Sequence, residues 1–465
     1  MEETFRERLS VLDKKGGRNW IYAKKPKGFF YDIRKWVSYL LLTTLFIMPF
    51  IKIDGHPFML FNVLGREFII FGVFFAPQDF YIFALVMIFF VVFIILFTIV
   101  FGRLFCGWVC PQTIFLEMLF RRIEYWIEGD ANQQKKLDAE KWHTSKIIKK
   151  TSKHILFFVL SFWIANTFLA YLIGIDSLYL LVVETPTKHL SSFIALVVFT
   201  GAFYGNFAFF RELSCIVVCP YGRLQSVLLD KSSIVVAYDY IRGEPRGKIQ
   251  KSKPLEETKK GACVDCNLCV QVCPTGIDIR NGTQMECVNC TACIDACDEV
   301  MVKTHQPTGL IRYASDENIK TGTKLKFNTR IAAYSAVLFL LAVLIGFLLF
   351  TRPEVQVQLL RAQGTLFYEV NPTTLSNLYN LELMNKTFKK MDIEIKVKDN
   401  VGKIKWVDGI KQFSLNKKEN KKATFFIEMQ KKDLQNISTK ITLSVFVNGK
   451  LSKEIQCSFL GGGKS

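Results

Sequence analysis

The sequence predicts an α-helical membrane protein of five spans, with a cysteine-rich insert before the last span and an all-β domain after it. Half of the 465 residues are hydrophobic, which is high for an ordinary soluble chain of this length. The apolar residues gather in runs long enough to cross a bilayer. Eight of the thirteen cysteines fall between Cys263 and Cys297, and such clustering indicates metal binding in a reducing compartment rather than disulfide bonds.

The predicted spans follow from the length of each apolar run, because a spanning helix needs about 20 apolar residues. Four runs meet this requirement, and a fifth is shorter but is bracketed by Lys35 and Lys52, whose long side chains can reach the interfaces. The predicted spans are Trp36–Ile51, Phe80–Phe101, Ile155–Ile175, Leu190–Phe210 and Ile331–Phe350. The charged residues 1–35 precede the first run, so we expect no cleavable signal peptide.

Lys and Arg beside the spans indicate the orientation of the chain, because short cytoplasmic loops hold the excess of positive charge. Residues 1–35 hold ten and residues 102–154 hold ten, whereas the loops after the first and third spans hold two and one. We expect the N-terminus and residues 211–330 to be cytoplasmic and everything after Thr351 to be periplasmic. The net charge of +19 then reflects orientation and contact with anionic membrane lipid, and we predict no nucleic-acid partner.

Two cysteine runs with the same spacing form the strongest signal in the insert. Each reads C-x-x-C-x-x-C-x-x-x-C, as in bacterial ferredoxins with two [4Fe–4S] clusters, where the fourth cysteine of each run ligates the other cluster. One cluster is predicted on Cys263, Cys266, Cys269 and Cys297, and the other on Cys287, Cys290, Cys293 and Cys273. Structural zinc sites are the alternative, but they do not need this interleaving. Asp298 stands where the first run has Pro274, so we expect a different turn after Cys297.

Two shorter motifs each follow a span that runs from outside to inside. RLFCGWVCPQ contains Cys106 and Cys110, and RELSCIVVCPY contains Cys215 and Cys219. Their similarity indicates a duplicated helical hairpin, with all four cysteines at the cytoplasmic interface near the insert. In each motif the second cysteine precedes a proline, which favours the first helical position. Cys110 and Cys219 are therefore candidate N-cap residues, and their pKa should fall toward the thiolate.

Several chemistries remain open for these four cysteines. Soft thiolates select Cu(I), zinc or iron–sulfur clusters, and each pair could instead cycle as a dithiol. The simplest alternative is that they are small buried hydrophobic residues at helix ends. Two pairs with the same C-P ending argue against that coincidence.

The segment after the last span predicts β-structure. Polar and apolar residues alternate in MDIEIKVKD, ATFFIEM and ITLSVFVNG, and Asn448-Gly449 is a turn signal. About 110 residues with several short strands suit an Ig-like β-sandwich. We expect its single cysteine, Cys457, to be a buried small residue.

These observations divide the chain into five parts. They are a cytoplasmic N-terminal segment (1–35), a membrane domain with four spans and both C-x-x-x-C-P motifs (36–230), a cytoplasmic 2[4Fe–4S] ferredoxin-like domain (231–330), a fifth transmembrane helix (331–351) and a periplasmic Ig-like β-sandwich (352–465).

On these residues the chain resembles the cytochrome c oxidase accessory protein family called CcoG, also known as FixG or RdxA. The similarity covers the spans, FCGWVCPQ, CIVVCPY, the paired cluster motif and the final sandwich. The resemblance implies a protein of the bacterial inner membrane that assists assembly of cbb3-type cytochrome c oxidase and reduces Cu(II) to Cu(I) for its copper centre. It also implies oxidase subunits or copper chaperones as partners. The residues with an implied copper-binding or redox role are Cys106, Cys110, Cys215 and Cys219, and the ferredoxin cysteines become the electron path.

Two other functions fit the same features. Membrane quinol dehydrogenases of the NapH and NosR type combine C-x-x-x-C-P pairs with ferredoxin runs and pass electrons from quinol to a periplasmic partner. A noncatalytic assembly platform would use the outer sandwich to dock a partner. The length of the outer domain favours an assembly protein over the dehydrogenase, and an assay of quinol oxidation separates them. In every case the electron donor is a further partner, which the sequence does not name.

Overall fold

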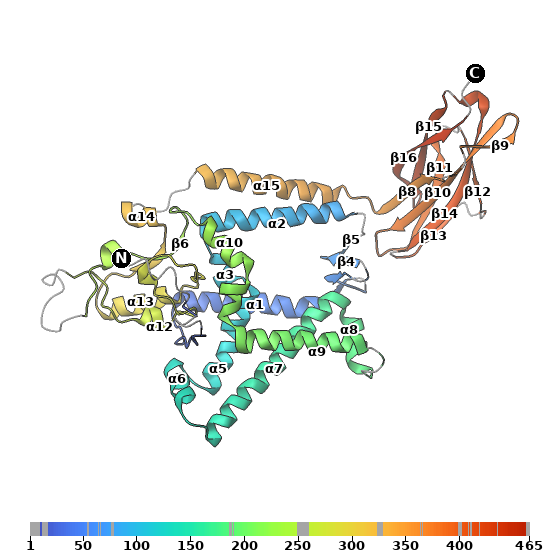
Figure 1. The fold of residues 1–465 in the computed structure, drawn as a ribbon. Coiled ribbons are helices and arrows are strands. Elements are labelled where there is room, and N and C mark those ends of the chain that lie inside the picture. The colour runs from blue at the N-terminus through green and yellow to red at the C-terminus, as the bar shows by residue number, and fades with distance from the viewer. Residues whose placement is uncertain are drawn as a thin grey trace. The chain divides into compact units, whose positions relative to one another are not determined.

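The computed structural model describes residues 10–461, except 12–16, 54, 64, 66, 76–78, 186, 187, 189, 249–259, 323–328, 363, 365, 399–401, 408, 410, 411, 418 and 435. The chain forms two compact units. The first comprises Met1–Ile51 and Ala84–Val343, and the second comprises Lys52–Phe83 and Leu344–Ser465. Figure 1 labels the elements of both units.

Helices make up the membrane part of the chain, because a lipid-facing segment must satisfy its backbone hydrogen bonds internally. In chain order they are α1 (Phe29–Ile47), η2 (Met48–Phe50), α2 (Phe80–Phe101), α3 (Leu104–Trp108), α4 (Pro111–Ile114), η4 (Phe115–Phe120), α5 (Arg121–Ile127), α6 (Ala131–Ala139), α7 (Thr144–Ile173), α8 (Ile175–Val183), α9 (Leu190–Gly205), η5 (Asn206–Phe210), η6 (Ser214–Val218), α10 (Pro220–Leu228) and α15 (Thr329–Phe350). The helices α7 and α9 pack side by side (Figure 1).

Four helices are long and apolar enough to cross a membrane. They are Phe80–Phe101, Thr144–Ile173, Leu190–Phe210 and Ile331–Phe350. All four correspond to predicted spans, so the prediction of an α-helical membrane protein is confirmed. The second of them begins earlier than Ile155 and ends at Gly174, whose φ of 83° is easily adopted only by glycine.

The remaining predicted span, Trp36–Ile51, differs from the helix observed there. α1 begins at Phe29 and ends at Ile47, where η2 with Pro49 interrupts it. It does not qualify as a membrane-crossing helix by length and composition, because its first two turns carry three charged residues. Its C-terminal half is nevertheless apolar, and Leu42 packs in one buried cluster with Phe157. The fifth span therefore stays a prediction.

The cysteine-rich insert is closed by a two-stranded antiparallel sheet. β6 (Val235–Tyr238) pairs with β7 (Ile311–Ala314), so the two ends of the insert lie together. Between and after them come α11 (Tyr240–Gly243), α12 (Leu268–Gln271), η8 (Ile279–Asn281), α13 (Ala292–Lys303) and α14 (Asp316–Thr321). Its apolar core includes Ile277, Ile294 and Met301 together with Cys263 and Cys269. Several cysteines thus belong to the core itself.

The C-terminal segment is a sandwich of two antiparallel sheets. One has the order β12-β14-β10-β8 with β9 paired to β10, and the other has the order β13-β11-β15-β16. The strands are β8 (Val355–Arg361), β9 (Tyr368–Asn371), β10 (Thr374–Asn385), β11 (Met391–Val397), β12 (Lys403–Trp406), β13 (Gln412–Leu415), β14 (Asn420–Gln430), β15 (Ser438–Val447) and β16 (Lys450–Leu460), with the 3-10 turn η10 (Lys431–Asp433) after β14.

Alternating burial along these strands builds the sandwich core, as the sequence pattern predicts. Leu383, Ile393, Phe425 and Phe459 are all completely buried in it. Asn448 and Gly449 have φ of 48° and 79° and form the predicted two-residue hairpin between β15 and β16. Cys457 is half-buried and packs against the same core, which fits a small apolar role.

The loop between α1 and α2 packs onto this sandwich within the second unit. Its strands are β1 (Lys52–Ile53), β2 (His56–Pro57), β3 (Leu60–Asn62), β4 (Glu67–Ile70) and β5 (Val73–Phe75). Ile69 and Phe74 are buried against Phe388. The buried Asp79 forms an ion pair with Lys386 at 2.6 Å. The loop and the sandwich therefore lie on the same side of any membrane that α2 and α15 cross, as their separate predictions require.

This contact sharpens a prediction of topology. A reporter that is active only in the periplasm should give a signal after Ser465 and none within residues 135–141, because the Lys and Arg asymmetry predicts opposite sides. A third fusion at the exposed Val63 should match the one after Ser465, since the loop and the sandwich share a core. Equal signals at Ser465 and residues 135–141 would contradict the predicted orientation.

Candidate metal centres

Each cysteine run of the insert folds as the same tight loop. Left-handed residues flank the second cysteine of both runs: Asp265 and Asn267 with φ of 54° and 57°, and Asn289 and Thr291 with φ of 52° and 66°. Asp and Asn tolerate this conformation, whereas a β-branched residue rarely adopts it. The Thr291 hydroxyl compensates by donating to the Cys290 carbonyl oxygen at 2.6 Å. These turns wind each run tightly, so that its thiols can face one side.

The eight thiols of the insert form two neighbouring sets. The first consists of Cys297 and its electrostatic neighbours Cys269, Cys263 and Cys266. The second consists of Cys293 and its neighbours Cys290, Cys287 and Cys273, with a weaker effect from Cys269. The fourth cysteine of each run thus lies with the first three of the other. Burial raises the pKa of both Cys297 and Cys287 to about 12. Ligation to iron requires the thiolate form.

The donor chemistry fits two iron–sulfur clusters. Each set offers four cysteine thiols, the number of ligands that one [4Fe–4S] cluster requires. Arg34 is 2% exposed, and its Nη2 has no hydrogen-bond partner within the part of the chain that the structure describes. Its charge opposes the rise that burial causes in the pKa of Cys290. An unpaired guanidinium N–H beside buried thiols suits a site that holds anionic sulfur.

Asp298 changes the backbone after Cys297, as expected from the missing proline. α13 continues through Cys297 and Asp298 to Lys303, whereas the first run has only the short α12 before Cys273 and Pro274. The Asp298 carboxylate accepts the backbone N–H of Gly309 at 2.8 Å and so ties the helix to the strand that follows.

The C-x-x-x-C-P motifs have the helix starts that their prolines predict. Cys110 is the N-cap of α4 and Cys219 is the N-cap of α10, each with the proline at the first helical position. Neither thiol makes a capping hydrogen bond, so both remain available. Cys106 lies on α3, and Cys215 lies on η6, a π-helical turn. π-Helical turns are rare in proteins as a whole, and those that occur are often found at functional sites.

The four thiols of the two motifs share one neighbourhood. Cys110 and Cys219 act electrostatically on Cys106, and all three act on Cys215. Burial raises the pKa of Cys106 to about 11 and that of Cys215 to about 12. The Cys106 thiol also donates to the Gln225 side-chain oxygen at 3.2 Å.

The first motif packs directly on a cysteine loop of the insert. A Cβ added to Gly107 would lie 2.4 Å from the Val288 carbonyl oxygen, so only glycine fits there. The Gly107 carbonyl accepts from Arg34 Nε at 2.7 Å. Cys106 and Cys290 belong to one buried apolar cluster. The two kinds of cysteine site are therefore in contact through packed protein.

Comparison with known proteins now adds the family. A 4Fe-4S dicluster domain matches residues 210–316, a 4Fe-4S binding domain matches residues 83–130, and the Ig-like fold at the C-terminal of FixG matches residues 345–462. The protein RdxB of Cereibacter sphaeroides is 32% identical over 394 residues, which cover 82% of each chain. The chain belongs to the FixG/RdxA family.

Two further members of the FixG/RdxA family show how far the similarity extends. The protein RdxA of Cereibacter sphaeroides is 32% identical over 399 residues, or 83% of each chain. The nitrogen fixation protein FixG of Rhizobium meliloti is 34% identical over 307 residues, which are 64% of this chain and 57% of FixG. The predicted family and fold class are confirmed, and this member is a membrane iron–sulfur protein of electron transfer.

Charged residues beside the motifs form a part of this FixG/RdxA site that sequence reasoning missed. Arg103, from the first motif, donates to Gln225 on α10 at 3.0 Å. Arg211, from the second motif, donates to Glu124 on α5 at 2.6 Å. The arginine of the first motif therefore bonds to the helix that follows the second motif, and the arginine of the second motif bonds to a helix that follows the first. The available signal was the arginine that opens both RLFC and RELSC.

The N-terminal segment is a second part that the sequence did not reveal. Asp295, between two cluster cysteines, accepts the backbone N–H groups of Phe30 and Tyr31 at 3.1 and 2.8 Å. A carboxylate at a helix N-terminus is favourable because it meets unpaired N–H groups and the positive helix end. A Cβ on Gly28 would lie 2.5 Å from Asp295, so the chain passes very close to the insert here.

Proposed function

We propose that this protein reduces Cu(II) to Cu(I) at its four C-x-x-x-C-P cysteines, using electrons from the iron–sulfur insert, and supplies the product to cbb3-type cytochrome c oxidase during assembly. The observation that carries the proposal is the contact at Gly107, which places Cys106 and Cys290 in one buried cluster. A redox substrate held by the C-x-x-x-C-P cysteines would then lie beside the cluster ligands of the insert.

The residues of the chain have separable roles in this proposal. Cys106, Cys110, Cys215 and Cys219 bind copper, because thiolates are soft ligands that favour Cu(I) over Cu(II). Gln225 and Arg103 hold the Cys106 thiol and its loop in place. The two clusters supply single electrons, so each reduced cluster can convert one Cu(II) to one Cu(I). Binding as thiolates also releases protons, so copper affinity should rise with pH.

The location follows from the orientation proposed for the chain. We place the protein in the bacterial inner membrane, with the N-terminus, both motifs and the insert cytoplasmic and the sandwich periplasmic. Its partners in this proposal are membrane lipid, oxidase subunits or copper chaperones, and an electron donor.

The direct test is a stoichiometry. Protein reduced anaerobically, freed of reductant and mixed with Cu(II) should yield about two Cu(I) per chain above the thiol background, one for each cluster. A Cu(I)-specific chelator measures the product. The background is set by the unfolded protein at equal thiol concentration, because free thiols also reduce Cu(II). A yield equal to that background would overturn the proposal.

A quinol dehydrogenase is the second candidate function. One finding supports electron transfer rather than copper binding at the first motif: the match to a 4Fe-4S binding domain covers residues 83–130, which contain Cys106 and Cys110 but none of the eight insert cysteines. In that case quinol alone should reduce the clusters in the absence of copper. Spectroscopic reduction by quinol, without any copper reduction, would favour the dehydrogenase.

A further inference from the structure

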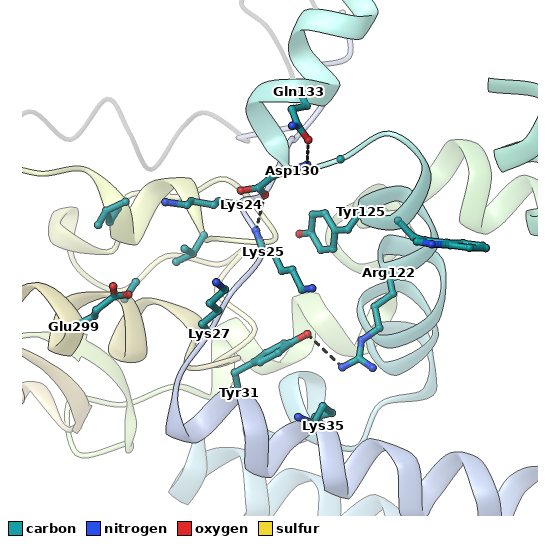
Figure 2. A pocket seen from close by; sticks show the side chains of 15 residues that line it. Lys24, Lys25, Lys27, Tyr31, Lys35, Arg122, Tyr125, Asp130, Gln133 and Glu299 are labelled. Carbon is teal, nitrogen blue, oxygen red and sulfur yellow. Dashed lines mark hydrogen bonds between the residues drawn. The ribbon is translucent and has the colours of Figure 1, made fainter. Parts of the chain in front are cut away.

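A cavity of about 830 Å³ opens beside the cluster cysteines of the first unit. Its walls come from the N-terminal segment, from the α5–α6 region and from the insert (Figure 2). The volume lies within the range of small-molecule sites in proteins. No function described above uses this cavity.

The lining carries an excess of positive charge. Its cations are Lys24, Lys25, Lys27, Lys35 and Arg122. The lining has two carboxylates. Glu299 pairs with Lys303 at 2.5 Å and its pKa is lowered by that lysine and also by Lys24 and Lys27. Asp130 accepts backbone N–H groups of Lys25 and Ala131 at 2.9 Å, so the five cations still exceed the negative charge of the lining. Within the described part of the chain, Lys24, Lys25 and Lys27 have no ion pair with a carboxylate. The cavity therefore favours a ligand of high negative charge.

The lysines stand on an anchored backbone. The Lys24 N–H donates to the Gln271 carbonyl at 2.8 Å, and the Lys25 N–H donates to Asp130. Figure 2 shows the Lys25 ammonium and the hydroxyls of Tyr31 and Tyr125 turned toward the same space. A prearranged charged wall reduces the cost of ordering side chains when a ligand binds.

Aromatic and apolar groups complete the cavity. Tyr31, Tyr125 and the exposed Trp126 offer flat surfaces on which a planar ring can stack. On the insert side, the wall consists of Leu268, Val272 and Ala296, each next in sequence to a cluster cysteine. All three pack in the apolar cluster that also contains Cys106 and Cys290. A ligand in the cavity would thus contact residues that are adjacent in sequence to cysteines of both thiol sets.

We propose that this cavity binds a reduced flavin mononucleotide, whose phosphate meets the lysines and whose ring lies against the aromatic residues, and that this flavin is the electron donor. The inference rests on the proposed electron path through the insert. One reduced flavin releases two electrons and two protons as it becomes oxidised flavin. Each [4Fe–4S] cluster accepts one electron, and the two protons are released to solvent. The known ability of flavins to give electrons singly matches the clusters.

Binding and electron transfer are tested on the intact protein in neutral-lipid nanodiscs, without copper. Flavin mononucleotide should quench the tryptophan fluorescence of the wild type more than that of Trp126→Phe, and it should bind at least tenfold more tightly than riboflavin, which lacks the phosphate. Inorganic phosphate should compete. The double variant Lys24→Gln/Lys27→Gln should bind flavin mononucleotide at least tenfold more weakly, and reduced flavin should reduce its clusters more slowly at limiting concentration. The matched control is Lys135→Gln/Lys141→Gln, which removes the same charge from exposed positions outside the cavity and should bind as the wild type does.

The remaining outcomes decide against the proposal. Equal binding of riboflavin and flavin mononucleotide would contradict the proposed contact between the phosphate and the lysines. Unchanged binding by the Lys24/Lys27 variant would contradict it as well. Displacement of flavin by nanodiscs that contain anionic phosphatidylglycerol would identify a lipid headgroup site instead. Unchanged iron content shows that each variant has folded. Because copper is absent, failure here leaves the proposed copper reduction to its own test.

Discussion

Replacing Cys110 and Cys219 together by Ala is expected to abolish copper binding and to reduce Cu(I) formation to the background level of free thiols, while the iron content stays unchanged. Both residues are N-caps whose thiols make no capping hydrogen bond, and both act electrostatically on Cys106 and Cys215. Their removal leaves a single cysteine in each motif, Cys106 and Cys215, and burial raises the pKa of both thiols, so neither motif keeps its pair of thiolate ligands. Neither residue belongs to the cluster runs, so iron is expected to remain.

The complementary variant separates binding from reduction. Cys266→Ala/Cys290→Ala should lose iron and copper reduction while still binding copper at the other four cysteines. Cys457→Ala is the control, because it removes a thiol in the sandwich that neither site uses. If Cys110→Ala/Cys219→Ala still reduces copper and quinol oxidation is robust, the copper proposal is wrong. The quinol dehydrogenase is then the supported function.

Iron analysis gives the second large effect. Anaerobically purified protein should contain about eight irons per chain, because the doubled motif specifies two cubanes of four. Cys266→Ala should lower the value toward four, since it removes a ligand from only one of the two thiol sets. EPR of the reduced protein should lose one of two interacting signals.

Cys215→Ala is the control for that measurement, since it also removes one cysteine but lies outside both runs. It should keep about eight irons. A wild-type value near four, or stoichiometric zinc, would exclude two clusters.

Local chemistry explains what the sequence predicted well. Hydropathy identified four membrane helices because lipid imposes a long uninterrupted apolar run. The prolines after Cys110 and Cys219 indicated two helix starts, since a proline at the first helical position loses no hydrogen bond. The spacing of the cysteine runs predicted how their thiols gather, because the gaps set how far a tight loop can reach.

Contacts between distant segments explain what it missed. Arg34 lies in the first charged segment, and nothing local indicates that its Nε meets the carbonyl of Gly107. Gly107 itself is one glycine among 28, and only the carbonyl of Val288 shows why a side chain cannot stand there. The start of α1 was placed too late because its charged first turns look like solvent-exposed sequence. Their N–H groups are in fact satisfied by Asp295.

The cap that Asp295 places on α1 also orders events during synthesis. Its partner Phe30 leaves the ribosome 265 residues earlier, so the cap on the first turn of α1 must wait until Asp295 has been made. During that interval only water can occupy its open N–H groups. The cap forms when the second cysteine run emerges, which is also when the full set of cluster ligands first exists. Closure of the N-terminal segment is therefore tied in time to the maturation of the iron–sulfur insert, and a chain truncated before residue 295 should retain a protease-sensitive N-terminus.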